Sequence, residues 1–122
     1  MENKYLLSLD GGGVREVATV IILSKLEKAL GTPLYKKFDF FVGTSAGAIT
    51  AMALSIAKMS GDDLLEFWSE ETFEKILDAS LWDSKLGLMQ TNPKYDGKGK
   101  KQVLNEYFGD LKLGDASGDL AI

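Results

Sequence analysis

Residues 38–58 read FDFFVGTSAGAITAMALSIAK, and the fold follows from this stretch. The compact apolar run from Phe38 to Val42 is typical of a buried strand. Ala48 to Lys58 is helix-prone and apolar on nearly every side, as expected of a helix enclosed between a sheet and other helices. Gly43 to Gly47 separates the two runs, so the stretch predicts a strand, a sharp turn and a buried helix.

The residues before this stretch repeat the same order. Tyr5 to Leu9 is a short β-prone run that stops at Asp10 and three glycines. A helix is predicted to follow until Gly31 and Pro33 stop it. Strand, helix, strand, helix predicts an α/β fold with a parallel sheet and right-handed crossovers. The apolar residues that recur at helical spacing in the first helix are Val14, Val17, Ala18, Ile21, Ile22, Leu26 and Leu30.

The second half of the chain gives weaker signals. Residues 60–63 have the composition of a helix start, and apolar side chains from Leu64 to Leu77 supply one further helical surface. Residues 91–99 are rich in Asn, Pro, Asp and Gly, which indicates a loop. A short helix from about Lys101 to Phe108 is predicted to end at Gly109.

Gly43, Ser45 and Gly47 form a Gly-x-Ser-x-Gly sequence between a predicted strand and a predicted helix, the context of a nucleophile elbow. A serine raised above the sheet on such a turn needs very small neighbours two residues away on each side. The free N–H groups of the following helix would favour the anion formed in acyl transfer. The alternative is an ordinary turn in which Ser45 only caps the helix.

Asp10-Gly-Gly-Gly-Val-Arg15 is the second motif, again between a strand and a helix. Three glycines leave backbone N–H groups uncovered, so this loop could direct two donors at an oxyanion. Arg15 could brace the loop by pairing with a carboxylate or a carbonyl, or could meet a substrate phosphate. Nucleotide binding is an alternative, although the chain lacks both the P-loop ending and the Gly-x-Gly-x-x-Gly spacing. A plain turn is the other alternative.

Composition limits the chemistry further. The 122 residues include no histidine and no cysteine, which removes the commonest general base, the commonest metal ligand and any thiolate site. We therefore expect no metal and no cofactor, and a serine activated here needs another base. The net charge of −4, from 14 basic and 18 acidic residues, argues against nucleic acid as a partner.

The same sequence carries no visible export or membrane-spanning segment. The apolar run before Asp10 is too short for a signal-peptide core. Glycine, serine and threonine interrupt the most apolar stretch, residues 40–57, so it does not read as a membrane span. We expect a cytoplasmic protein that contacts membranes at most peripherally.

Together the two motifs, about 30 residues apart and each after a strand, resemble those of the patatin-like phospholipases. The likeness continues weakly through residues 93–97 and 107–113, and so covers essentially the whole chain. The resemblance implies a three-layer α/β sandwich with a mainly parallel central sheet. It also implies a Ser-Asp dyad that hydrolyses lipid acyl esters without histidine. By position, Ser45 is the nucleophile; the oxyanion donors are Gly11, Gly12, Gly13 and Ala46, and the supporting residues are Asp10, Arg15, Gly43 and Gly47.

Two departures from the family pattern stand out. Family members usually carry a small residue where this chain has Glu16, so the packing of that helix start is expected to differ. The family's catalytic aspartate lies downstream in Asp-Gly-Gly or Asp-Gly-Ala, which residues 96–98, 115–116 and 119–120 do not match. We therefore expect residues 1–122 to be the N-terminal portion of one patatin-like catalytic domain, truncated at the C-terminus. The base would lie on missing sequence or on another chain, and this portion alone should release little fatty acid.

Two further groups of side chains each have a functional and a purely structural interpretation. Some apolar residues could line an acyl-chain pocket or belong to an ordinary core: Phe67, Trp68, Trp82, Leu86, Leu88 and Met89. A basic cluster could attract anionic lipid headgroups or form a solvated loop: Lys94, Lys98, Lys100 and Lys101. The main alternative to an enzyme is a lipid- or protein-binding module that keeps the fold but lacks a base.

Overall fold

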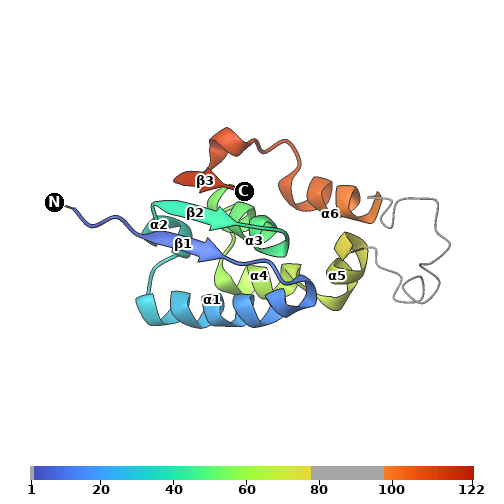
Figure 1. The fold of residues 1–122 in the computed structure, drawn as a ribbon, viewed down its shortest axis with the longest axis horizontal. Coiled ribbons are helices and arrows are strands. Elements are labelled where there is room, and N and C mark those ends of the chain that lie inside the picture. Colours follow the sequence, from blue (N-terminus) through green and yellow to red (C-terminus); the bar gives the residue numbers. More distant parts are fainter. Residues whose placement is uncertain (1, 78–97) are drawn as a thin grey trace.

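The computed structural model describes residues 2–77 and 98–122, which are arranged around a small parallel sheet (Figure 1). Its strands are β1 (Leu6–Leu9), β2 (Phe40–Gly43) and β3 (Asp119–Ala121), in the order β1-β2-β3. Both pairings are parallel, with Leu9 opposite Gly43 and Phe40 opposite Asp119. The α/β architecture with a parallel sheet is thus confirmed, and β3 adds a strand that no sequence pattern indicated.

The two faces of the sheet differ in cover. Phe41 and Leu9 point to the covered side and are buried, and helix α3 (Ala46–Ser55) packs there against all three strands. Side chains alternate along a strand, so the next residues face the other way. Of these, Leu6 is 54% exposed, and the neighbouring Ser8 is also exposed. In residues 2–77 and 98–122, the structure therefore supplies helical cover on one face of the sheet and leaves the other face open.

Helix α1 (Glu16–Leu30) follows a 3₁₀ turn, η1 (Gly13–Arg15), and ends as predicted at Gly31, whose φ is 65°. The face that it buries differs from the apolar face in the sequence. Val14 and Ile22 are each 65% exposed, whereas the buried positions include Glu16, Val20, Leu23 and Ser24. The apolar periodicity of this segment was therefore wrong as a guide to burial.

Contact with helix α4 (Gly61–Phe67) sets the rotation of α1. A Cβ at Gly61 would lie within 3.1 Å of three atoms of Ser24, so the two helices touch backbone to backbone there. Ser24 Oγ donates a hydrogen bond to Asp62 at 2.8 Å, and Lys28 pairs with the same carboxylate at 2.9 Å. These polar contacts turn the Ser24 side of α1 inward and leave its apolar side outward.

The helical surface predicted from Leu64 to Leu77 is split into α4 and α5 (Glu70–Leu77). The start of α4 is as predicted, because the Ser60 hydroxyl accepts the N–H of Asp63 at 3.1 Å. The break falls at Trp68, which leaves helical geometry at ψ 44°. Its indole N–H donates to Thr50 at 2.9 Å, so an inward hydrogen bond accompanies the interruption.

The remaining elements are short. Helix α2 (Leu34–Lys37), which the sequence did not indicate, begins after Pro33. Helix α6 (Lys98–Phe108) starts three residues before the predicted position and ends at Gly109, as predicted. The 3₁₀ turn η3 (Leu113–Asp115) then leads into β3. None of the helices in the described ranges combines the length and apolar character needed to cross a bilayer.

Candidate active site

Ser45 stands at the junction of β2 and α3, at the carboxyl end of the sheet. Its backbone has φ 54° and ψ −126°, a conformation that costs a non-glycine residue about 1–3 kcal/mol. The residue is exposed, and its side chain makes no capping hydrogen bond to α3. Capping therefore does not account for this serine, and its hydroxyl is presented to solvent on a strained turn.

Three glycines of the two motifs, Gly11, Gly43 and Gly47, lie where backbone segments touch and leave no room for a side chain. A Cβ at Gly43 would fall on the carbonyl oxygen of Gly47, and a Cβ at Gly47 on that of Leu9. A Cβ at Gly11 would lie 2.5 Å from the carbonyl oxygen of Thr44 and 2.6 Å from the Cβ of Ser45. The Gly11 loop and the serine turn therefore pack directly on each other, as the pairing of the motifs implied.

The backbone N–H groups around Ser45 do not all have the same availability. The Gly11 N–H donates to the Thr44 hydroxyl at 3.2 Å, so it holds the two loops together. No acceptor among the described residues takes the N–H groups of Gly12, Gly13 or Ala46. Gly13 has φ 57°, a value that favours glycine. Of the four predicted donors, these three therefore have no partner among the described residues, whereas Gly11 donates to Thr44.

Arg15 and Asp10 flank the glycine loop. Arg15 is exposed, and a Cβ at Gly12 would lie 3.4 Å from its Cβ and Nε, which places the arginine along the loop. Within the part of the chain that the structure describes, its guanidinium has no carboxylate or carbonyl partner. Asp10 is exposed at the end of β1. The predicted bracing role of Arg15 therefore has no partner in these residues.

Glu16 forms a buried polar contact beneath the site that sequence reasoning missed. It is 1% exposed, and its Oε1 accepts the Thr50 hydroxyl at 2.6 Å. Thr50 in turn accepts the indole N–H of Trp68, while Glu16 Oε2 is buried without a hydrogen-bond partner. Burial raises the pKa of Glu16 more than the Thr50 bond lowers it. The unusual residue after Arg15 thus ties the start of α1 to the nucleophile's helix.

Glu16→Gln should make stability less dependent on pH. Because the folded pKa of Glu16 is raised, the unfolded chain releases this proton first as pH rises. The free energy of unfolding then falls as pH rises from the ordinary glutamate range through the folded pKa. Glutamine does not titrate. The thermal unfolding midpoint of the variant minus that of the native protein should therefore increase as pH rises from about 4 to about 8. Melting curves of both proteins across that range measure the difference.

Glu74→Gln is the matched control, because Glu74 is exposed on α5. It should follow the native pH profile. Parallel profiles for the native protein and Glu16→Gln would show that folding does not raise the pKa of Glu16.

Three aspartates from the Asp-containing segments considered in the sequence, Asp96, Asp115 and Asp119, have different outcomes. Asp115 accepts the backbone N–H of Lys112 at 2.7 Å within η3. Asp119 stands opposite Phe40, three residues before Gly43 along the strand direction, which is about 10 Å. Asp96 lies outside the described residues. Asp119 therefore stands at the amino end of its strand and not at the carboxyl edge with Ser45.

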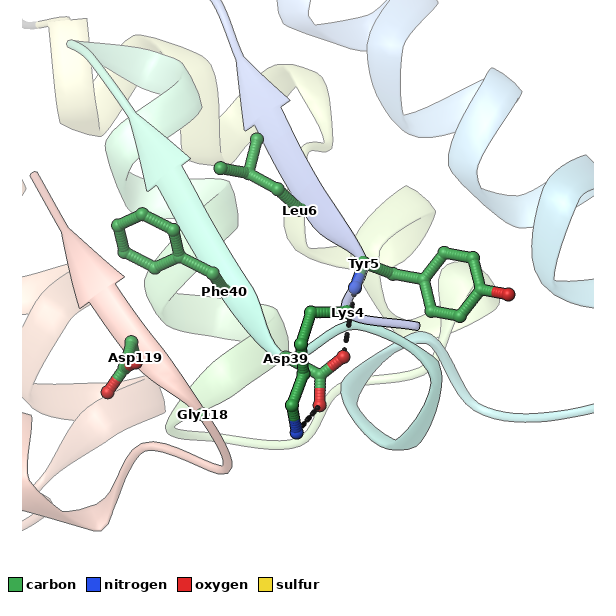
Figure 2. A pocket seen from close by; sticks show the side chains of 7 residues that line it. All are labelled: Lys4, Tyr5, Leu6, Asp39, Phe40, Gly118 and Asp119. Atoms are coloured by element: carbon green, nitrogen blue, oxygen red, sulfur yellow. Dashed lines mark hydrogen bonds and ion pairs between the residues drawn. The ribbon is translucent and has the colours of Figure 1, made fainter. Parts of the chain in front are cut away.

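A hollow of about 460 Å³ lies at the opposite, amino edge of the sheet (Figure 2). Its lining includes Lys4, which pairs with Asp39 at 3.2 Å. The backbone N–H of Tyr5 and then the Lys4 ammonium lower the pKa of Asp39. Asp119 also lines this hollow. Among the described residues, no group of three carboxylates could hold a metal ion.

The structure describes only part of the apolar group and of the basic cluster that the sequence analysis considered. Phe67 and Trp68 are 0% and 3% exposed and belong to the core, so the acyl-pocket role considered for them is wrong. The other four members of that group lie outside the described residues. In the basic cluster, Lys98, Lys100 and Lys101 are exposed at the start of α6, and Lys94 is also outside the described residues.

Comparison with known proteins agrees with this arrangement. The family model for patatin-like phospholipases matches residues 7–122. Phospholipase A I of Arabidopsis thaliana is 32% identical over 130 residues, which cover 96% of this chain and 10% of that protein. A cGAMP-activated phospholipase of Pseudomonas aeruginosa (strain BWHPSA011 / Pa011) is 36% identical over 111 residues, which cover 91% of this chain and 33% of that protein.

A shorter match is closer in sequence. A cUMP-AMP-activated phospholipase of Escherichia coli is 47% identical over 51 residues, 42% of this chain and 16% of that protein. The chain therefore spans a third or less of the length of these relatives. With the family match over residues 7–122, the chain belongs to the patatin-like phospholipase family.

Proposed function

We propose that this chain carries the nucleophile and the oxyanion hole of a lipid acyl hydrolase of the phospholipase A type. The observation that carries the proposal is the strained, exposed Ser45, with three neighbouring backbone N–H groups that have no acceptor in residues 2–77 and 98–122. A serine held in this way is costly to keep, and strain of this kind gathers at functional sites. Family membership provides independent support.

The chemistry assigned to the site is acyl transfer. Ser45 Oγ attacks the ester carbonyl carbon, its proton passes to a carboxylate base, and the carbonyl oxygen becomes an oxyanion. The N–H groups of Gly12, Gly13 and Ala46 are the donors we assign to that oxyanion, each able to lower the barrier by a few kcal/mol. The alcohol leaves with a proton, and water then hydrolyses the acyl-serine. The base is the dyad aspartate, which we place outside residues 1–122.

The substrate class follows from the family and from the loop. We assign a lipid ester, with phospholipid favoured because the Arg15 guanidinium beside Gly12, which has no partner among the described residues, suits a phosphate. Access to such a lipid would require at least peripheral contact with a membrane. A second candidate, a binding module without catalysis, would keep the same turn but release no acyl groups.

Covalent labelling tests the nucleophile directly. A fluorophosphonate should modify the intact protein at Ser45, because the hydroxyl is exposed and neighbouring N–H groups stabilise the anion formed during attack. Mass spectrometry of peptides locates the adduct. The exposed Ser117 should stay unmodified under the same conditions. An unlabelled Ser45 would refute the proposal, and labelling without acyl release from phospholipid vesicles would favour the binding module.

A further inference from the structure

One face of helix α3 lines up with the nucleophile. Ala48, Met52 and Ile56 follow Ser45 at intervals of three, four and four residues, and Ile49 lies beside them. At 3.6 residues per turn Ala48, Met52 and Ile56 share one face of the helix, and Ser45 immediately precedes its first residue, Ala46. Side chains on a helix tilt toward its N-terminus, which here is the end that holds Ser45. Met52 is about 10 Å and Ile56 about 16 Å along the axis from Ser45.

This face is apolar although it is not fully covered. Ala48, Ile49 and Met52 are each partly exposed, whereas Ala46, Thr50 and Leu54 elsewhere on α3 are buried. A partly exposed helix face in a globular protein normally carries polar or charged residues. Helix α3 has no charged residue in its ten positions. The uncovered part of α3 is therefore built from apolar side chains alone.

The far end of this face opens into a pocket. Its walls are Met52 and Ile56 from α3, Leu104 and Phe108 from α6, and Leu111, Lys112 and Leu113 from the segment that follows. Its volume is about 180 Å³. The lining has one charged residue, Lys112, and the remaining side chains are apolar.

From this alignment we propose that the α3–α6 pocket binds the distal part of the fatty acyl chain whose carbonyl is attacked by Ser45. This inference rests on the proposed function, and it assigns the acyl chain a defined course along Ala48, Ile49 and Met52. The occupant must reach both a hydroxyl at one end of α3 and an apolar pocket two turns away, which suits a flexible hydrocarbon chain.

The size of the pocket argues against other ligands. Sites for drug-sized molecules usually enclose about 300–1,000 Å³, so about 180 Å³ is small for a nucleotide or a ring system. Polar ligands also need convergent donors and acceptors, which leucine, methionine, isoleucine and phenylalanine side chains do not provide. Each methylene buried contributes about 0.8 kcal/mol, so even a few carbons in the pocket would discriminate strongly by chain length.

Alkyl fluorophosphonates of short and long chain test this inference on the intact protein, used below the concentration at which the long reagent forms micelles. The long-chain reagent should label Ser45 at least about tenfold faster, the effect of burying about two methylenes. Met52→Trp fills the pocket and should remove this preference, so that the ratio of the long-chain to the short-chain labelling rate falls to within about twofold. Leu104→Trp fills the same pocket from α6 and should act alike, in case one variant folds poorly. Ile22→Trp, on the 65% exposed position of α1, is the control and should keep the preference.

The outcomes separate the two proposals. Rapid labelling of Ser45 without chain-length preference, as expected if another part of the protein fills the groove, would overturn the pocket and leave the nucleophile standing. A preference that survives in both folded pocket variants would also overturn it. Failure of both reagents to label Ser45 would refute the proposed function itself.

Discussion

Ser45→Ala is expected to lower acyl release by the intact protein by about 10⁴-fold or more. Loss of the nucleophile in a serine hydrolase removes the covalent route and leaves only what the oxyanion donors and binding supply. The side chain of Ser45 makes no capping hydrogen bond to α3, so the variant should unfold at nearly the native temperature. Initial rates of fatty-acid release from phospholipid vesicles measure the effect, and thermal unfolding checks the fold.

Ser117→Ala provides the comparison for that experiment. Ser117 is exposed, and the bond that it makes to Ser55 uses its backbone N–H, which alanine keeps. This variant should retain full activity. Activity in Ser45→Ala comparable to that of Ser117→Ala would show that another group attacks the ester.

Gly47→Ala is expected to have the largest effect on stability, a loss of about 3 kcal/mol or more. The new methyl group would meet the carbonyl oxygen of Leu9 and lie 2.8 Å from its carbonyl carbon and 3.1 Å from that of Asp10. These are backbone atoms, and Leu9 is paired with Gly43 in the sheet. They cannot move aside without disturbing β1, its pairing or the glycine loop. Urea unfolding, or soluble yield if the variant is too unstable, measures the loss.

Gly114→Ala is the matched substitution. A Cβ at Gly114 meets no heavy atom within 4 Å, and its φ is not in the positive range. Stability should change by no more than about 0.5 kcal/mol. If the two alanine variants unfolded alike, the backbone contact between the glycine loop and the serine turn would not exist in solution.

The two motifs could be located from the sequence because their constraints are local. Glycine at 43 and 47 reports that there is no room for a side chain, and the adjoining apolar runs report a strand and a buried helix. The C-terminal ends of α1 and α6 could be predicted in the same way, because Gly31 and Gly109 each end a helix with a positive φ. Each of these predictions depended on a few adjacent residues. The catalytic role of Ser45 itself remains a proposal.

Other features depend on partners far along the chain, and these the sequence did not disclose. The inward face of α1 follows from the close contact of Gly61 with Ser24, which overrode the apolar periodicity of the helix. Glu16, where the family usually has a small residue, is buried and bonded to Thr50, which lies 34 residues away. Helix α5 became separate where Trp68 turns toward Thr50. Gly11, predicted as an oxyanion donor, gives its N–H to Thr44.

The sequence by itself determined the α/β rhythm, the sharp turn at Ser45 and the glycine loop paired with it. These features arise from strand and helix propensities and from positions that accept only glycine. Residues adjacent in the sequence determine both the propensities and those positions. Only the tertiary structure decided which N–H groups of the two motifs find acceptors among the described residues and which face of α1 is buried. Those outcomes depend on contacts between segments that are far apart in the sequence. Hydrogen-bond partners and close packing contacts of this kind are not encoded in neighbouring residues.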